Sequence, residues 1–512
     1  MADSRERAFQ DEIINALGCR GWLVGKASEY DRANALYPED LVGYFQEAWP
    51  DRWEKLCKSN PQNPEKVLIQ QTVRALEKRG TLDVLRHGFK IPAVKIDLCS
   101  FKPDHGMNPD TERRYKANRL RVVEEVSYSP HAREGEYNPR LDLVLFVNGI
   151  PVTTLELKSE FKQTVEHAKR QYKKDRPVKD PLTRKPEPLL TFKRGALVHF
   201  AVSQDEVAMT TKLNGKDTFF LPFIRGTADG GAGNPRAEDE DTYATAYLWE
   251  QLFQKDNWLK VIGRFLHLEK KTEEDFYGNR KTKETLIFPR YHQWDVVNQL
   301  VQTTRSEGAG KRYLIQHSAG SGKSNSIAWT AHQLAQLYDE EGQKLFSSII
   351  VVTDRTVLDS QLQNTIYQFE HAQGVVRPIS RDLGNQSKSE QLAEALSEQT
   401  RIIIVTIQTF PALFDALDKH PKLAAGRYAV IADEAHSSQT GSSATKLKAI
   451  LGGDLREGEE VSAEELLDAA VAARKPSQQI SYYAFTGSTP FPRTVLKRRT
   501  VFCPEQQLYV AS

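Results

Sequence analysis

Three residues in the first third of the chain have types and spacing suited to phosphodiester hydrolysis. Asp142 lies in the apolar run LDLVLFV, and Glu156 and Lys158 end the next run, VTTLELKS. Residues i and i+2 of a strand share a face, so Glu156 and Lys158 should project together. Two carboxylates on neighbouring strands can bind Mg²⁺, which activates water and stabilises phosphate charge. We therefore expect Asp142 and Glu156 to be metal ligands and catalytic residues, with the Lys158 ammonium positioning the water or stabilising charge.

A glycine-rich segment in the second half is suited to nucleotide phosphates. The sequence HSAGSGKS at 317–324 follows the apolar run YLIQH and precedes the helix-like run SNSIAWTAHQLAQLY. Backbone amides of such a turn point at phosphate oxygens, a lysine neutralises β/γ charge, and a serine hydroxyl coordinates Mg²⁺. The residues expected to bind ATP here are Gly320, Ser321, Gly322, Lys323 and Ser324, with Ser324 also a metal ligand.

An acidic pair ends another apolar run and complements the glycine-rich segment. Asp433 and Glu434 close YAVIAD and open the sequence DEAH. A carboxylate at the carboxyl edge of a strand can hold Mg²⁺, which assigns Asp433 as a metal ligand. The neighbouring Glu434 is then expected to orient or deprotonate the water that attacks the γ-phosphate.

The elements that must position these residues follow from hydrophobic periodicity. Residues 1 to about 100 read as interrupted helices, and 119–158 read as short strands with Asn148-Gly149 as a hairpin turn. After 286, short apolar runs alternate with helical stretches, the pattern of parallel strands covered by helices. We expect an α/β protein, with a nuclease domain at 1–265, a polar linker at 266–285 and a motor domain at 286–512.

Composition excludes several classes of protein. The chain has 70 Lys+Arg against 68 Asp+Glu, a net charge of +2, so it does not hold nucleic acid by bulk charge, although a local basic groove remains possible. Its four cysteines form no CxxC pair, so neither a zinc ribbon nor a disulfide framework is indicated. No signal peptide or apolar run of membrane-spanning length is visible, and we expect a cytoplasmic protein with no membrane partner.

The ordered motifs of the second half resemble the first RecA-like domain of superfamily 2 helicase-type ATPases. The resemblance implies that Gln293, in FPRYHQWDVV, reads adenine. It also implies that Arg355, in TDRTVLDSQL, and Gln408, in VTIQTF, contact the nucleic-acid backbone.

The first-half pattern Asp-x13-Glu-x-Lys resembles the core of PD-(D/E)xK nucleases, with Leu141 in place of the common proline. A tyrosine motif follows the lysine in many of these nucleases. Here Tyr172 matches it, but Ala168 stands where glutamine is expected. Glu6 or Glu12 on the first predicted helix is a candidate to support the metal site. The basic tract at 162–194 is expected to face DNA, with Tyr172, Lys173 and Lys174 as possible DNA-contacting residues.

A nuclease placed before a DEAH motor resembles the restriction (R) subunit of type I restriction-modification enzymes, whereas type III restriction subunits carry the nuclease after the motor. The resemblance implies an ATP- and Mg²⁺-dependent endonuclease that joins methyltransferase (M) and specificity (S) subunits. It further implies that the motor pulls in double-stranded DNA and that cleavage occurs far from the recognition site.

Only 22 residues follow FTGSTP (485–490), too few for a second RecA-like domain. We therefore expect a truncated chain that binds ATP weakly and does not translocate. Two alternatives stay open at this point. One is a DNA-repair or RNA helicase-type ATPase with a non-catalytic N-terminal domain. The other is a non-catalytic DNA-binding or assembly fragment.

Overall fold

The computed structural model of the chain forms two compact units. The first comprises residues 1–225 and 232–290, and the second comprises residues 226–231 and 291–512. The structure describes residues 4–92, 94–104, 108–133, 135–159, 164–226, 233–235, 242–274, 278, 280–317, 321–353, 356–369, 375–379, 387–406, 409–433, 438–439, 461–462, 479–486 and 499–500.

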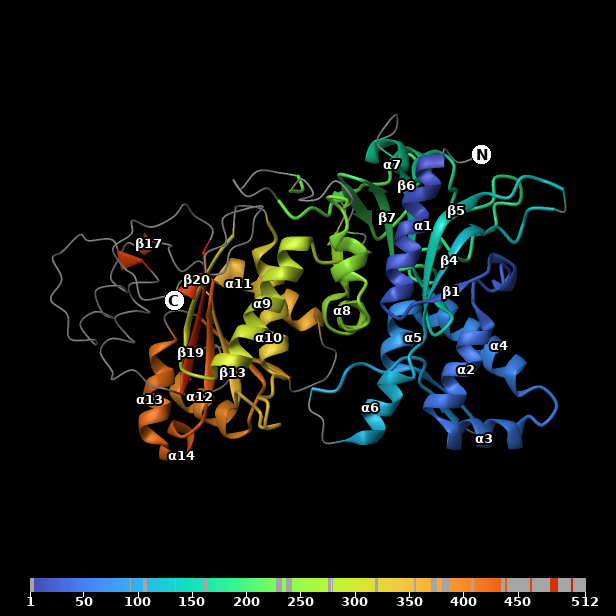
Figure 1. Cartoon of the computed structure of the whole chain (residues 1–512). Helices are drawn as coiled ribbons and strands as arrows, with labels where there is room; N and C mark the ends of the chain where they lie inside the picture. The colour runs from blue at the N-terminus through green and yellow to red at the C-terminus, as the bar shows by residue number, and fades with distance from the viewer. Residues whose placement is uncertain are drawn as a thin grey trace. The chain divides into compact units, whose positions relative to one another are not determined.

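A mixed seven-stranded sheet forms the centre of the first unit (Figure 1). Its spatial order is β1-β4-β5-β6-β7-β8-β9, parallel between β1 and β4 and between β6 and β7, and antiparallel elsewhere. The strands are β1 (Leu23–Gly25), β4 (Leu120–Ser127), β5 (Arg140–Val147), β6 (Ile150–Lys158), β7 (Val198–Ser203), β8 (Val207–Thr210) and β9 (Leu221–Pro222).

The predicted hairpin turn is confirmed between β5 and β6. Asn148 has φ 49° and Gly149 has φ 76°, so both central residues are left-handed, as a type I′ turn requires. The turn pairs Val147 with Ile150, but the register shifts by one residue between Leu145 and Phe146. Opposite that shift, Pro151 lacks the N–H that a regular ladder needs, and proline within a sheet is found at edges and bulges.

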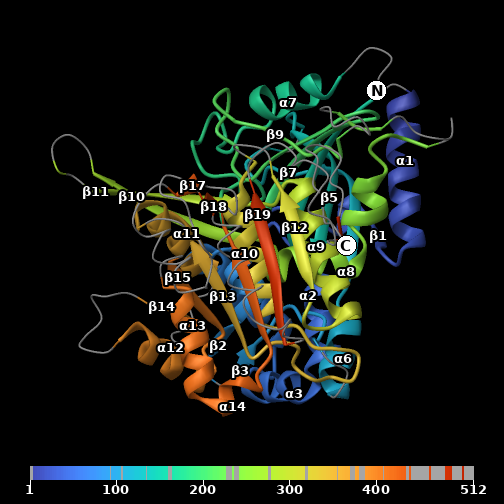
Figure 2. The same cartoon turned by 90° about the vertical axis from the view of Figure 1, so that its left-hand side faces the viewer.

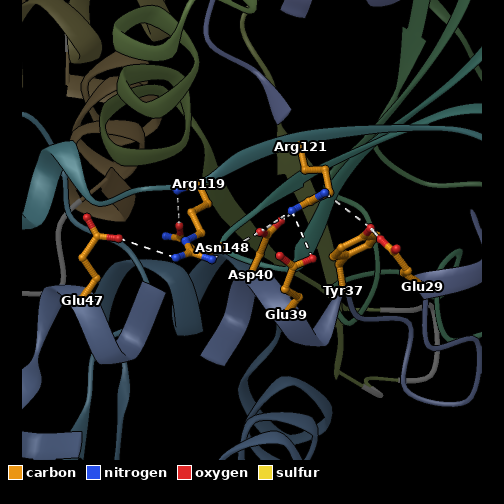
Figure 3. A network of polar contacts seen from close by, with 8 residues as sticks. All are labelled: Glu29, Tyr37, Glu39, Asp40, Glu47, Arg119, Arg121 and Asn148. Carbon is orange, nitrogen blue, oxygen red and sulfur yellow. Dashed lines mark hydrogen bonds and ion pairs between the residues drawn. The ribbon is translucent and has the colours of Figure 1, made fainter. Parts of the chain in front are cut away.

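The turn is anchored by a buried polar network, shown in Figure 3. Asn148 accepts a hydrogen bond from the Arg119 N–H (2.7 Å) and donates to the Leu98 carbonyl (2.8 Å). The Tyr37 N–H donates to the Gly149 carbonyl oxygen (2.8 Å), which fixes the start of helix α2 (Pro38–Ala48) on the turn.

An arginine from β4 holds the other side of this network (Figure 3). Arg121 Nε and Nη2 bind the fully buried Asp40 carboxylate at 2.6 and 2.8 Å, and the guanidinium lies 4.3 Å from the centre of the Tyr37 ring. A forked arginine-carboxylate pair matches two donors to two acceptors, so both buried charges are satisfied. The network therefore ties α2 to β4 and to the hairpin turn.

Helices and one short hairpin, β2 with β3, accompany the first sheet. The expected helical character of the N-terminal 100 residues is present, and the stretch around Trp249 and Trp258 is helical with two π-type segments. The elements are α1 (Ser4–Cys19), η1 (Ala27–Glu29), α3 (Pro50–Ser59), α4 (Pro64–Arg79), α5 (Thr81–His87), β2 (Phe89–Ile91), β3 (Val94–Ile96), α6 (Pro109–Lys116), α7 (Val165–Lys174), η2 (Leu248–Leu252), α8 (Lys255–Lys260) and η3 (Val261–Phe265).

The segment expected to be a linker has regular structure. Most of 266–285 lies in an antiparallel pair, β10 (His267–Glu274) with β11 (Arg280–Ile287), which belongs to the first unit. Lys193 and Lys270 both bind Glu284 of this pair, at 2.7 and 3.4 Å. The many charged residues here lie on exposed strand faces, where they form ion pairs between the strands. Polar composition alone does not distinguish such strands from a loop.

The second unit contains a parallel sheet, as the alternating runs predict. Its order is β14-β15-β13-β16-β19-β12-β20, and every described pairing in it is parallel. Figure 2 shows β15 beside β13, and β19 beside β12. The strands are β12 (Arg312–Gln316), β13 (Ser348–Thr353), β14 (Val376–Pro378), β15 (Ile402–Thr406), β16 (Tyr428–Ala432), β19 (Ile480–Thr486) and β20 (Arg499–Thr500).

The remaining elements of the second unit are helices and one short antiparallel pair. They are α9 (Tyr291–Glu307), α10 (Lys323–Leu334), α11 (Thr356–Phe369), α12 (Lys388–Ser397), α13 (Pro411–Lys419), α14 (Pro421–Ala424), β17 (Ser438–Gln439) and β18 (Val461–Ser462). Across the described ranges of both units, no helix has the length and hydropathy needed to cross a bilayer.

Replacing Gly149 should destabilise the first unit more than replacing a glycine with the same backbone conformation in open space. A Cβ at Gly149 would meet the Tyr37 carbonyl oxygen, whereas one at Gly21 (φ 88°) would meet nothing within 4 Å. We expect Gly21→Ala to lower the free energy of unfolding by about 1–2 kcal/mol through strain alone. Gly149→Ala should cost about 1–3 kcal/mol more. Urea unfolding of both variants tests this, and equal losses would contradict close packing of the turn.

Candidate functional site: buried carboxylates and a phosphate loop

Asp142 and Glu156 lie at the same end of the β5–β6 pair. Leu143 pairs with Leu155, so the same register places Asp142 across from Glu156 on one face of the sheet. The Leu157 N–H donates to Asp142 Oδ2 (2.7 Å), which fixes one carboxylate oxygen. The structure thus brings together the two carboxylates that the sequence proposes as metal ligands.

Burial sets the electrostatics of both carboxyl groups. Loss of solvent raises the pKa of Asp142 to about 6, opposed by the positive charge of Lys158. Glu156 is fully buried, and that burial, with the neighbouring Asp142 charge, raises its pKa well above the ordinary range. The Asp142 charge acts on Glu156 because the two carboxylates are close together, and a divalent cation bound by both would offset their repulsion.

Arg176 holds Glu156 in place. Its Nε lies 2.6 Å from Glu156 Oε1 and its Nη2 lies 3.3 Å from Oε2, and Arg176 is only 4% exposed. Arg176 belongs to the basic tract that was predicted to face DNA, but its side chain faces the protein interior. The physical reason is that a buried carboxylate without a partner is strongly unfavourable, so the fold pairs Glu156 with a cation.

Lys158 is fixed by the first helix. Its Nζ lies 3.1 Å from Glu6 Oε1, and both side chains are largely buried. Figure 1 shows that α1 begins near the end of the sheet where β6 ends. Of the two acids proposed to support the site, Glu6 is therefore the one that reaches a site residue. Glu12 is a described residue with a different environment beside Tyr243.

A polar cluster beneath the carboxylates includes the motif tyrosine. Thr154 Oγ1 lies 2.7 Å from the Tyr172 hydroxyl and 2.7 Å from His199 Nδ1, and all three residues are buried. Tyr172, proposed as a possible DNA contact, thus lies in the interior, where α7 packs against β6. The Tyr172 hydroxyl is hydrogen-bonded to Thr154, which lies two positions before Glu156 on β6. Tyr172 therefore supports the strand that carries Glu156.

The carboxylates have the donor chemistry that Mg²⁺ prefers. Within the part of the chain that the structure describes, no group of three or more His, Cys, Asp or Glu side chains gathers at metal-ligand spacing. Asp142 and Glu156 would therefore supply two oxygen-donor groups, and Mg²⁺ commonly keeps waters and substrate phosphates as its other ligands. The site residues fit such an ion.

The proposed DNA-facing lysines differ from Tyr172. Lys174 is exposed and Lys173 is half-buried, both at the end of α7. Other members of the tract form internal contacts: Lys193 binds Glu284, and the largely buried Arg194 donates to the Asn34 carbonyl oxygen (2.7 Å). A run of positive charge in sequence thus divides into exposed and structural members.

In the second unit, the glycine-rich segment joins β12 to α10, as predicted. Gly322 has φ +81° and precedes Lys323, the first residue of α10. Two parallel strands hold the start of the loop, because the His317 N–H donates to the Thr486 carbonyl oxygen (2.8 Å). His317 Nδ1 lies 2.9 Å from Ser321 Oγ, and burial lowers the His317 pKa to about 3, so the buried imidazole is neutral.

Lys323, at the start of α10, forms an ion pair with Asp433, which follows β16. Lys323 Nζ lies 3.0 Å from Asp433 Oδ1, and Asp433 directly follows β16. Ser324 is the next residue of α10, so its hydroxyl and the Asp433 carboxylate are the groups that would hold a nucleotide-bound Mg²⁺. The lysine and the aspartate were chosen from separate motifs, and the parallel sheet brings them together.

Gln293 contacts the same loop. Its Nε2 donates to the carbonyl oxygens of Ser321 (3.1 Å) and Gly322 (3.0 Å), and the side chain is buried. The side chain therefore packs at the loop that would hold phosphates. Its proposed reading of adenine stays a prediction. Gly320, Glu434, Arg355 and Gln408 lie outside the described residues.

Two family models match the two parts of the chain. Residues 29–218 match the model "Type I restriction enzyme R protein N terminus", and residues 292–503 match the model "SWI2/SNF2 ATPase". The first match contains Asp142, Glu156 and Lys158, and the second contains Lys323 and Asp433. The predicted resemblance to the N-terminal portion of an R subunit, and the α/β class with a RecA-like ATPase domain, are confirmed by these matches.

Similar proteins point the same way. The type I restriction enzyme HindI endonuclease subunit of Haemophilus influenzae is 27% identical over 438 residues, covering 81% of this chain and 36% of that protein. A Methanocaldococcus jannaschii protein, assigned to a type I restriction enzyme as its MjaVIIIP endonuclease subunit, is 24% identical over 420 residues, covering 75% of this chain and 35% of its own length. The chain thus spans about a third of the length of these relatives.

Among solved structures, the UvsW helicase from bacteriophage T4 matches 39% of this chain and 53% of its own chain. Its sequence identity is 15% and its TM-score is 0.24, a likeness too low to assign the fold.

Removing Arg176 should destabilise the first unit strongly. Arg176→Ala leaves the Glu156 carboxylate buried without its partner, and we expect the free energy of unfolding to fall by about 3–5 kcal/mol. The matched control is Lys179→Ala, an exposed cation three residues on, which should change it by less than about 0.5 kcal/mol. Urea unfolding in the presence of a metal chelator measures the free energy of unfolding of both variants. A loss as small as the control's would mean that the ion pair is not buried in solution.

His199 should make stability depend on pH. Burial lowers the pKa of His199 to about 3, while an unfolded histidine titrates near 6.5. The unfolded chain therefore binds the extra proton first, and the stability present above about pH 6.5 is lost as pH falls towards 3. We expect the wild type to lose about 1.4 kcal/mol per pH unit more than His199→Gln over that range.

Urea unfolding at pH 7.5 and pH 5 measures this difference. The control is His87→Gln, at an exposed histidine of the same unit, which should follow the wild type. Parallel behaviour of the wild type and His199→Gln would show that His199 is accessible to protons in the folded state.

Proposed function

We propose that this chain, as the N-terminal portion of a type I restriction enzyme R subunit, is the ATP- and Mg²⁺-dependent endonuclease component that cleaves double-stranded DNA. The observation that carries the proposal is the placement of Asp142 and Glu156 on one face of β5–β6 with Lys158 at the same end. The chain is proposed to act with methyltransferase and specificity subunits, and the proposed domains are a nuclease at 1–265 and a motor at 286–512.

The proposed chemistry is hydrolysis of a phosphodiester bond. A bound Mg²⁺ would supply Lewis-acid stabilisation of the phosphate and a more acidic water. Asp142 and Glu156 would hold the ion, with Arg176 limiting the positions open to the Glu156 carboxylate. Lys158, held by Glu6, would place its ammonium beside the phosphate and stabilise the negative charge that develops as water adds and the P–O bond breaks.

The motor half is proposed to bind ATP at the loop before α10. Lys323 would exchange its contact with Asp433 for the β/γ-phosphates, and Ser324 and Asp433 would hold the nucleotide's Mg²⁺. Glu434 is proposed to orient the attacking water, and Gln293 to recognise adenine. Arg355 and Gln408 are proposed to contact the DNA backbone during translocation.

Mg²⁺-dependent nicking of supercoiled plasmid, with and without ATP, tests the nuclease assignment. Asp142→Asn and Glu156→Gln preserve shape and most hydrogen bonds but remove negative charge, and each should reduce nicking by about 100-fold or more. The matched control is Glu166→Gln, an exposed acid on α7 that binds only Lys169 among the described ion pairs. Lys323→Ala should leave ATP-independent nicking unchanged.

Nicking that survives both Asp142→Asn and Glu156→Gln would refute the site. Folded wild-type protein that binds DNA but never nicks it with Mg²⁺ or Mn²⁺ would favour a non-catalytic binding module.

A further inference from the structure

Two loops rise from the end of the first sheet where the carboxylates lie. The described residues 129–133 and 135–139 belong to the loop that joins β4 to β5. The last ladder bond before this loop, from the Tyr128 N–H to the Pro139 carbonyl oxygen (3.2 Å), lies three residues from Asp142. At the rise of an antiparallel strand, three residues span about 10 Å. The second loop, 177–187, follows Arg176 directly, and Arg176 binds Glu156. Each loop is therefore rooted beside one proposed metal ligand.

These two loops, hereafter the loop pair, are bound to each other. Ser129 Oγ donates to Glu187 Oε1 (2.8 Å), and His131 Nε2 lies 3.1 Å from the Pro186 carbonyl oxygen. Figure 1 shows the two loops projecting side by side from the sheet near β5. Because one buried and one exposed polar contact join their bases, the loops form one projecting structure rather than two independent segments.

The second loop is itself closed into a tight hairpin. Lys179 and Pro186 form a β-bridge, and the Asp180 N–H donates to the Lys185 carbonyl oxygen (2.9 Å). The Asp180 carboxylate accepts the Thr183 N–H, and Arg184 adopts φ 59°. The conformation of the tip that carries Leu182 is therefore fixed by hydrogen bonds within the loop. The Asp180 carboxylate takes part in them by accepting a backbone N–H.

The tips expose large apolar side chains among cations. Tyr137 is 80% exposed and Leu182 is 85% exposed, the two highest values among the large hydrophobic residues of the described chain. The exposed cations of the loop pair are Arg133, Lys179, Arg184 and Lys185. Against them, the described loop residues include two acids near the surface, Asp180 and Glu136. Glu136 accepts the Arg133 N–H.

We propose that the loop pair is the surface that seats duplex DNA beside the scissile phosphate, with its cations on backbone phosphates and Tyr137 and Leu182 against the minor groove. This assignment rests on the proposed function, because it takes DNA as the substrate of the neighbouring carboxylates. Exposed apolar tips beside cations fit a duplex, whose minor groove admits apolar side chains and whose backbone is anionic.

The position of the loops supports duplex DNA over a protein partner. A duplex with one phosphate at Asp142 extends in both directions from that point. The loop pair begins about 10 Å away, so it must either contact the duplex or obstruct it. Cations at the tips make contact favourable. A protein subunit on the same tips would compete with the substrate for this space.

Equilibrium binding of a fluorescein-labelled duplex of about three helical turns to the full chain in EDTA tests the proposal by anisotropy over a salt series. The charge variant is Lys179→Gln/Arg184→Gln/Lys185→Gln. It should weaken binding by roughly tenfold or more and reduce the slope of log affinity against log salt by about 3. The apolar variant, Tyr137→Ser/Leu182→Ser, should weaken binding with an unchanged slope, because it removes no phosphate contact.

Matched controls lie elsewhere in the same unit. Lys55→Gln/Lys66→Gln/Lys78→Gln removes three exposed cations from α3 and α4, and Leu23→Ser/Val24→Ser removes two exposed apolar side chains from β1. Both should bind DNA as the wild type does. All four variants should keep the wild-type unfolding midpoint, since the changed side chains are solvent-exposed.

Wild-type affinity and slope in both loop variants would overturn the proposal, as would wild-type protein that binds no duplex. Equal losses in the loop and control variants would also overturn it, by showing that binding is not localised. Failure of the proposed function is separable, because it is read from metal-dependent nicking by wild type and Asp142→Asn, whereas this result is read in EDTA, where no cleavage occurs.

Discussion

The register between β5 and β6 is the constraint on which the candidate nuclease site depends. The type I′ turn pairs Val147 with Ile150, and a regular hairpin continuing from it would set Asp142 opposite Leu155. Glu156 would then point to the other face, because neighbouring residues of a strand alternate. The one-residue shift next to Pro151 moves Glu156 into line with Asp142. A local irregularity in the ladder therefore decides whether the two carboxylates share a face.

The polar network around the turn stabilises that register from the far end of the hairpin. Asn148 and Gly149 accept hydrogen bonds from the backbone N–H groups of Arg119, directly before β4, and Tyr37, directly before α2, so the turn cannot slide without breaking them. Arg121 and Asp40 complete the anchoring with a buried forked ion pair. A buried ion pair lies towards each end of β5–β6: Arg121 with Asp40 near the turn, and Arg176 with Glu156 at the other end. One end fixes the position of the strands, and the other presents carboxylates.

The two units combine charged side chains in different ways. In the first unit, the negative charge of Glu156 is balanced by Arg176, and both side chains of this ion pair are buried. In the second, Lys323 and Asp433 pair across the carboxyl edge of a parallel sheet, where a nucleotide can exchange places with the ion pair. His317, at the start of the glycine-rich segment, is buried and neutral, so it adds packing without adding charge.

The sequence by itself determined the hairpin turn, the parallel sheet of the second unit and most element types, although not the β10–β11 pair. It also offered Asp142, Glu156, Lys158, Lys323 and Asp433 as the candidate site residues. These follow from local periodicity, from the φ > 0 requirement of an Asn-Gly turn and from short motifs. Tertiary structure alone decided that Arg176 pairs with Glu156, that Glu6 rather than Glu12 reaches Lys158, and that Tyr172 lies inside. Such pairings join residues far apart in the chain, and burial, which sets their energies, is a property of the packed fold. Pro151 was the one local sign of the bulge, yet the direction of the register shift depends on the strands beside it.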